Sequence, residues 1–239
     1  VLQTGSNKSL YKFKVTAMNG PVAFHKFTFQ HSSSTGTFAK ATTSKYAMYV
    51  YTDAFTTPDS TFQSATAGDN GADGLLNSSS CYMNESAQTQ VNTVGIAGSG
   101  IEIMLDKSAT ACAAGTHTAF ASTTYNVPSG ATRWFELRAT IAGVETQTGT
   151  ESIDVQLNGD VAYPTTLPNP NGINGAFATA GFAMSDAEAI DRDTNNDLLW
   201  SPLSTTTTAT LQALDWTNGY QVPGLPGVSM AAETLTSAN

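Results

Sequence analysis

Charged side chains are scarce in this chain: Asp, Glu, Lys and Arg together make up 12% of its 239 residues, about half the usual share. Long helices need such residues on their exposed faces, so the composition argues against a helical protein. Thr, Val, Tyr and Phe, which favour strands, are well represented. The composition therefore predicts an all-β fold.

Basic side chains are the scarcer of the two charged kinds. Ten Lys and Arg stand against nineteen Asp and Glu, which gives a net charge of −9 and a pI near 4.5. Nucleic acids and anionic membrane surfaces recruit clustered Lys and Arg, so we expect neither as a partner. No apolar run approaches the roughly 18 residues of a membrane-spanning helix, so the sequence predicts no membrane span.

Cysteine is limited to Cys81 and Cys112. Two cysteines without nearby histidines supply too few ligands for a zinc site. The chain begins at Val1 rather than Met, as expected of a secreted protein whose leader has been removed. In that compartment the two thiols would pair and close a loop of about 30 residues, which contributes about 3 kcal/mol. Two unpaired thiols in a cytoplasmic protein are the alternative.

Catalytic motifs are missing as well. The sequence has no Gly-x-Ser-x-Gly elbow, no His-Glu-x-x-His helix and no phosphate-binding glycine loop. Glu102, Glu136 and Asp154 lie on predicted strands and could face each other as the acid pair of a glycosidase. Outward carboxylates on strands are far commoner, so we expect no enzyme, no catalytic residue and no organic cofactor.

What the sequence does have is a strong strand signal from Leu10 to Gln30. Apolar Tyr11, Phe13 and Val15 alternate with polar residues, which is typical of a half-buried strand. An Asn-Gly turn follows, and the second strand carries phenylalanines first on one face and then on the other. That switch predicts a bulge or a strand buried on both faces.

Further alternating stretches, at 45–53, 100–106, 133–141 and 151–157, complete the strand pattern. We predict an antiparallel β-sandwich of roughly nine to eleven strands with long Ser/Thr/Gly/Asn-rich loops, and the pattern leaves jelly-roll and immunoglobulin-like Greek-key connections open. One domain would span residues 1–239. The proline-rich stretch 164–175 is a possible sub-boundary, and segments 1–9 and 228–239 are possible assembly arms.

Oxygen-bearing side chains at alternate positions form the most specific cluster: Asp191, Asp193, Asn195 and Asp197. This spacing fits a calcium loop. Pro202 stands where such a loop has its closing Glu, so calcium would need further ligands from elsewhere. A solvated acidic turn is the alternative. A weaker cluster of the same kind is Asp69, Asn70 and Asp73.

Two patterns bear on sugars. Aromatic residues on predicted strands are either core or a sugar-stacking platform: Tyr46, Tyr49, Tyr51 and Trp134. The acceptor pattern for N-linked glycans occurs at Asn7, Asn77 and Asn84.

The segment SLYKFKVTAMNGPVAFHKFTF resembles the strand that opens β-sandwich modules in secreted surface proteins of environmental bacteria. NDLLWSPLS at 196–204 and DWTNGYQVPGLPG at 215–227 resemble the end of such proteins. The resemblance implies an extracellular or cell-surface protein, in the broad company of surface-layer proteins and TasA-like fibre proteins. It implies no catalytic residue.

We therefore expect a structural subunit of an extracellular filament, pilus-like fibre or surface layer, with identical subunits as partners. An apolar hairpin at the start of the chain leaves an open edge, which a strand of a neighbouring subunit can pair with. The expected assembly residues are Val1, Leu2, Leu10, Tyr11, Phe13 and Val15. A monomer whose ends pack on its own sheet, and a secreted carbohydrate-binding or adhesive module with glycans as partners, are the alternatives.

Overall fold

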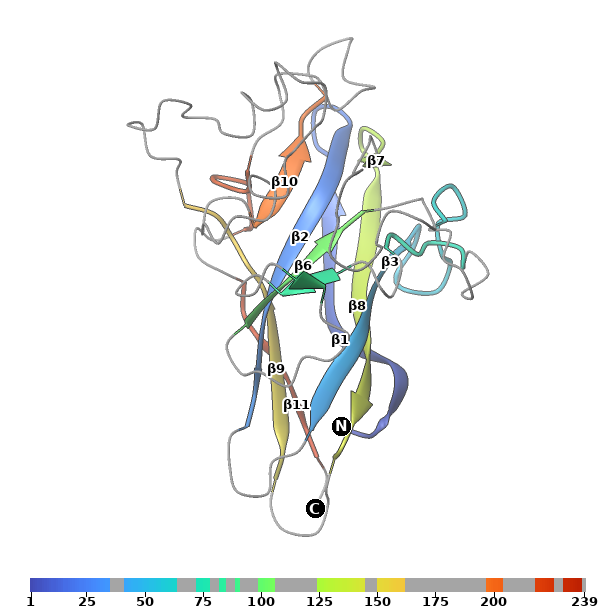
Figure 1. The fold of residues 1–239 in the computed structure, drawn as a ribbon. Coiled ribbons are helices and arrows are strands. Elements are labelled where there is room, and N and C mark those ends of the chain that lie inside the picture. The colour runs from blue at the N-terminus through green and yellow to red at the C-terminus, as the bar shows by residue number, and fades with distance from the viewer. Residues whose placement is uncertain are drawn as a thin grey trace.

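The computed structural model describes residues 1–34, 41–63, 72–77, 82–84, 89–90, 99–105, 124–144, 150–161, 197–203, 218–225 and 230–237. Within these ranges the chain is all-β, without a helix, and its strands pair antiparallel, which confirms the predicted fold class (Figure 1). In the same ranges no helix has the length and hydropathy to cross a membrane.

Three strands form what we call the small sheet, in the order β1-β8-β3: β1 (Gly5–Thr16), β8 (Thr132–Ala142) and β3 (Thr42–Tyr51). Its register sets Phe13 opposite Phe135 and Phe135 opposite Val50. Residues opposite each other point to the same face of a sheet, so these three share one face. Trp134 and Glu136 therefore point to the other face, which is the alternation of the sequence.

The other described strands form what we call the large sheet. Its path is β11 (Glu233–Thr236), β9 (Ser152–Leu157), β2 (Val22–Ser33), β6 (Ser99–Met104), β4 (Tyr82–Asn84) and β5 (Thr89–Gln90), while β10 (Leu198–Ser201) and β7 (Tyr125–Val127) also pair with β2. Because four strands pair with β2, that strand organises the large sheet, and Figure 1 shows β9 and β10 following each other along it.

β1 and β2 follow each other in the chain but do not pair as a hairpin. β1 pairs with β8, and β2 belongs to the large sheet. Asn19, at φ 62°, begins the connection between them. β2 is buried at nearly every position, as predicted for a strand covered on both faces. Such a strand needs partners along both edges and layers on both faces, so β1 packs across it instead of beside it.

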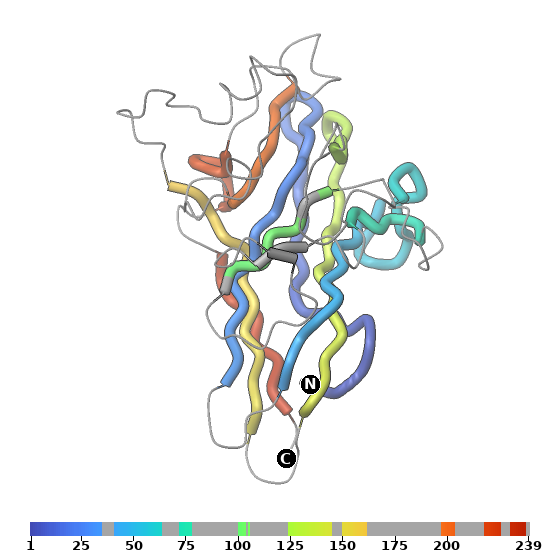
Figure 2. The backbone as a smooth tube through the Cα atoms, viewed as in Figure 1, coloured from blue at the N-terminus to red at the C-terminus, as the bar shows by residue number. Residues whose placement is uncertain are grey.

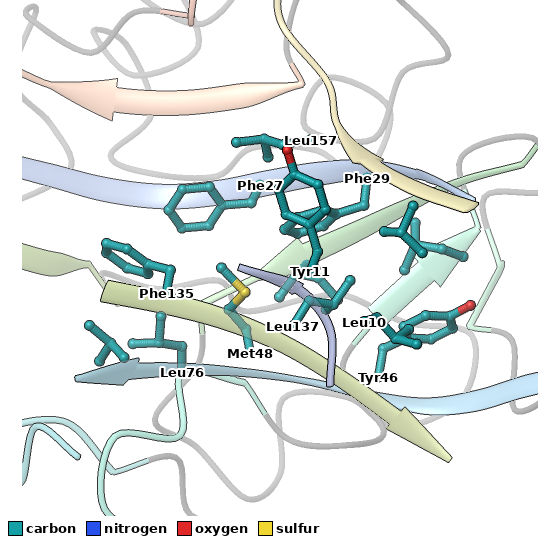
Figure 3. Close-up of a cluster of buried hydrophobic side chains, with 14 of the residues drawn as sticks. Leu10, Tyr11, Phe27, Phe29, Tyr46, Met48, Leu76, Phe135, Leu137 and Leu157 are labelled. Atoms are coloured by element: carbon teal, nitrogen blue, oxygen red, sulfur yellow. The ribbon is translucent and has the colours of Figure 1, made fainter. Parts of the chain in front are cut away.

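An aromatic cluster lies between the two sheets. Phe13 and Phe135 of the small sheet stack with their ring centroids 5.1 Å apart, and each lies 5.5 Å from Phe27 of the large sheet. Figure 3 shows Phe27 and Phe29 on one side of this core and Phe135, Leu137 and Met48 on the other. Burial of one such side chain contributes about 1.5–3 kcal/mol, so the cluster is a main source of stability.

His31 on β2 is a buried titratable group in the same interior. Its Nε2 lies 3.4 Å from the Thr43 hydroxyl, and its ring meets that of Tyr46 edge-on. Burial lowers the pKa of His31 to about 4, although the charge of Asp154 acts in the opposite direction. The folded protein therefore favours the neutral imidazole.

We expect the free energy of unfolding to fall as the pH drops from 6.5 to about 4. In that window the unfolded chain takes up a proton at His31 and the folded chain does not, so acid favours unfolding. The pKa difference corresponds to about 3 kcal/mol. Urea denaturation at pH 7 and pH 4.5 should show a smaller loss for His31→Gln than for the wild type. Equal losses in the two proteins would contradict this role of His31.

Candidate functional site

β1 is an edge strand over its 12 residues. It pairs with β8 along one edge, and no strand of the described ranges pairs along the other. An unpaired edge presents a row of backbone N–H and C=O groups to any strand that approaches it. We call this the β1 edge.

The two halves of the β1 edge differ. Leu10 and Tyr11 are buried, and the Tyr11 hydroxyl donates a hydrogen bond to the carbonyl of Ala231 at 3.0 Å. Phe13 and Val15 are half-buried, although they point to the core face. The half that begins at Phe13 is therefore the one with apolar surface left to cover.

Regularity distinguishes the same two halves. The pairing with β8 shifts register between Gly5 and Lys8 and again between Ser9 and Tyr11, and from Tyr11 to Thr16 it is continuous. Bulges bend a strand and hinder further pairing along it. The continuous half, residues 13–16, is therefore the section that can accept another strand.

The opposite edge of the small sheet is covered. Along β3, the N–H of Val50 donates to the carbonyl of Gly74 at 2.8 Å, and the N–H of Leu76 donates to that of Met48 at 2.8 Å. Gly74 has φ 74°, and a Cβ there would lie 2.4 Å from the Val50 carbonyl oxygen. Only glycine allows this close approach, so the segment 72–77 closes the β3 edge.

The two ends of the chain pack on the chain's own sheets. Leu2 is buried, its N–H donates to the Thr236 carbonyl at 2.7 Å, and it forms a parallel bridge with Ser237. Val1 is 78% exposed. Figure 2 shows the described terminal segments together at one end of the molecule. This is the packing of an unassembled subunit, and a donated N-terminal segment would first have to leave it.

The outer face of the small sheet holds an ionic cluster around Glu136. The buried carboxylate lies 2.7 Å from the Arg138 guanidinium and 3.4 Å from Lys12 Nζ, and it accepts a hydrogen bond from the Tyr51 hydroxyl at 2.8 Å. Burial by itself would raise the pKa of Glu136, but hydrogen bonds from Ser9, Arg138 and Tyr51 bring it below its ordinary value. The carboxylate is therefore held in its charged form.

Aromatic rings surround this cluster. The Arg138 guanidinium lies 4.8 Å from the Tyr49 ring centre, and Lys12 Nζ lies 4.7 Å from that of Phe55. Phe55 has φ 67°, a strained conformation for a bulky residue. Its loop is fixed by the Asp53 carboxylate, which accepts N–H bonds from the two threonines that follow Phe55.

The predicted aromatic platform is only partly assembled. Tyr49 and Trp134 lie half-buried on the outer face, and Tyr51 is buried there. Tyr46 points to the core and is fully buried. Sequence reasoning missed Arg138 and Phe55, because neither a mid-strand arginine nor a strained loop position has a local signal.

The three strand carboxylates named from the sequence lie on three different strands. Glu136 is on β8 of the small sheet, whereas Glu102 is on β6 and Asp154 on β9 of the large sheet. Glu136 is already bound to Arg138 and Lys12, and Glu102 to Lys26. The arrangement gives no reason to assign an acid pair.

The calcium prediction falls mostly outside the described residues, which include only Asp197 of the four proposed ligands. Asp197 is buried, and its N–H donates to Asp160 Oδ1 at 2.7 Å. Of the weaker cluster only Asp73 is described, where it accepts a hydrogen bond from Gln63. The described part of the chain contains no group of three or more His, Cys, Asp or Glu placed to hold a metal ion.

Cys81 and Cys112 lie outside the described residues. Of the glycosylation candidates, Asn7 lies exposed on β1, and the side chain of Asn84 is not described. Asn77 is fully buried, where its amide accepts the N–H of Met48 and donates to the carbonyl of Tyr46. A glycan on Asn77 would have to replace both of these hydrogen bonds.

Comparison with known proteins adds no relative: no family model, no curated protein and no solved structure matches this chain.

Proposed function

We propose that the protein is an antiparallel β-sandwich of the predicted nine to eleven strands, and that it serves as a structural subunit of an extracellular filament or surface layer. The observation that carries the proposal is the β1 edge, which no described strand pairs with and whose regular half carries the half-buried Phe13 and Val15. A strand from a second copy would extend the small sheet by one.

Strand addition at this edge has a physical basis. Each backbone hydrogen bond gained contributes about 0.5–1.5 kcal/mol net, and the added strand also covers Phe13 and Val15. The register is set because an added side chain that faces the core must lie over this apolar surface. Strand addition to an open edge is a general recognition mode.

The donor that we propose is the arm of residues 1–4. Leu2 attaches this arm to Thr236, and Thr4 attaches it to the N–H of Val144 at 3.3 Å. Few contacts have to break for the arm to leave its own subunit. Donor arm and acceptor edge are different surfaces, so the contact is head-to-tail and generates a filament where the rotation does not close.

A charge placed at Val15 tests the acceptor. Val15→Lys would point an ammonium into the contact, and inward charges on edge strands block pairing. We expect this variant to sediment as a folded monomer at concentrations where the wild type forms large assemblies. Thr16→Lys is the matched control, because the next residue along the strand is exposed on the other face, and it should assemble like the wild type. Assembly of Val15→Lys to normal lengths would reject the β1 edge as acceptor.

Glycan binding is a second candidate function, and it rests on the outer face of the small sheet. There the half-buried Tyr49 and Trp134 lie on either side of the Glu136 cluster, and aromatic rings beside charged groups suit a sugar. Glycan-array binding that is lost in Trp134→Ala would favour this function. The disulfide between Cys81 and Cys112 and a calcium ion held by Asp191, Asp193, Asn195 and Asp197 remain predictions.

A further inference from the structure

Lys26 on β2 is 0% exposed, and its Nζ lies 2.6 Å from Glu102 Oε1 on β6, which is 1% exposed. Removal of two such charges from water is costly, and their attraction offsets the cost only where the geometry is good. A fully buried lysine is also rare among soluble proteins. The pair therefore calls for an explanation beyond stability.

A third buried charged residue, Asp160, follows β9 and is 0% exposed. Its Oδ2 accepts the N–H groups of Leu198 at 3.0 Å and Gly219 at 2.6 Å, and its Oδ1 accepts that of Asp197 at 2.7 Å. A Cβ at Gly219 would lie 2.8 Å from Oδ2, so glycine lets the backbone come this close. The carboxyl group is thus fixed in one orientation.

Asp160 and Glu102 approach Lys26 from opposite edges of β2. Leu198, whose N–H holds Asp160, pairs with Phe27, and the next residue pairs with Lys26. β6, which carries Glu102, pairs with the same part of β2 along its other edge. The charge of Lys26 acts directly on Asp160. The lysine therefore lies between the two carboxyl groups.

The surroundings favour uncharged forms at Asp160. Burial raises the pKa of the Asp160 carboxyl, although the three N–H groups and the charge of Lys26 act in the opposite direction. A buried carboxylic acid next to a buried amine, with water excluded, is the arrangement in which an amide can form and persist.

We propose that Lys26 and Asp160 condense into an intramolecular amide cross-link, with Glu102 as the proton carrier. Glu102 first passes one proton from the Lys26 ammonium to the Asp160 carboxylate, which leaves a neutral amine and a neutral acid. The Nζ lone pair then attacks Cγ of Asp160 and forms the C–N bond. Glu102 takes a proton from the attacking nitrogen and returns it to the departing hydroxyl, so the C–Oδ1 bond breaks and one water molecule leaves.

The hydrogen bonds at Asp160 fit this step. Oδ2, with two N–H donors, is the oxygen that carries the negative charge of the tetrahedral intermediate, as an oxyanion hole would hold it. Oδ1, with one donor, is the oxygen that leaves. The overall reaction consumes an ammonium and a carboxylate, releases water and leaves Glu102 ionised, so no oxidant or other reactant is needed.

The cross-link would join β2 to the segment after β9 by a covalent bond, which resists pulling where hydrogen bonds alone would yield. It forms within one chain, so the inference is independent of the assembly proposal and would hold for a monomeric protein.

Intact-mass spectrometry of the folded full-length protein tests the inference. We expect a mass lower than that of the sequence by one water molecule, and a tryptic digest in which cleavage after Lys26 is absent and a branched peptide joins Lys26 to Asp160. Lys26→Arg and Glu102→Gln should both show the full mass, while Asp154→Ala, a carboxylate on the surface of β9, should show the same loss as the wild type.

A wild-type protein that is folded by circular dichroism, has the full mass and is cleaved after Lys26 would overturn the proposal. A loss of water that persists in Glu102→Gln would overturn the role of Glu102. Because the readout is a mass and not a stability, a variant that folds poorly is checked by the branched peptide of the wild type alone.

Discussion

The free energy of unfolding is expected to fall by about 3–5 kcal/mol when Phe135 is replaced by Ala. Phe135 is fully buried at the centre of the aromatic cluster, where its ring stacks on Phe13 and meets those of Phe24, Phe27 and Tyr125. Both sheets contribute to this contact, so a cavity there weakens the packing between them. Urea denaturation followed by near-ultraviolet circular dichroism would measure the change.

Trp134→Ala is the matched control. Trp134 precedes Phe135 on β8 but points to the outer face and is half-buried. Its truncation should cost less than half as much, although the side chain removed is larger. Equal losses at the two positions would show that the face of β8 has been assigned wrongly.

Asp160→Ala has the second large expected effect. The substitution leaves three buried N–H groups, those of Asp197, Leu198 and Gly219, without their acceptor. Each unsatisfied buried donor costs about 1–3 kcal/mol, so we expect a loss comparable to the total stability of a typical domain. Thermal unfolding should then show no cooperative transition, or one at a much lower temperature.

Asp154→Ala provides the comparison for this effect. Asp154 accepts a hydrogen bond from the Thr234 hydroxyl at the exposed edge of β9. Water replaces such a contact easily, so the loss should be below about 0.5 kcal/mol. A small effect of Asp160→Ala, similar to that of Asp154→Ala, would contradict the described hydrogen bonds.

The strand faces could be predicted from the sequence because period-two alternation is local. Trp134 and Phe135 were separated correctly by their neighbours alone, and β2 was recognised as buried on both faces by its shifted phenylalanines. The pairing of β1 with β8 could not be predicted this way. The choice between a hairpin and two separate sheets depends on contacts made more than a hundred residues away.

The buried charges had no local signal. Lys26 occupies the polar position of an alternating stretch, where a lysine is normally exposed, and Asp160 closes an Asn-Gly-Asp sequence that reads as a turn. The partners of the Asp160 carboxylate lie 37 to 59 residues further along the chain. Only the folded chain brings them together, and the same holds for Phe55 and Lys12 on the outer face.

The central claim is that the β1 edge is where subunits join. Amide hydrogen exchange, compared between dilute and concentrated protein, tests it most directly because it reports on the backbone N–H groups of the edge themselves. We predict that residues 13–16 become protected at high concentration, together with the arm of residues 1–4. Unchanged exchange along the β1 edge in protein that has assembled, or the absence of any assembly at high concentration, would contradict the account.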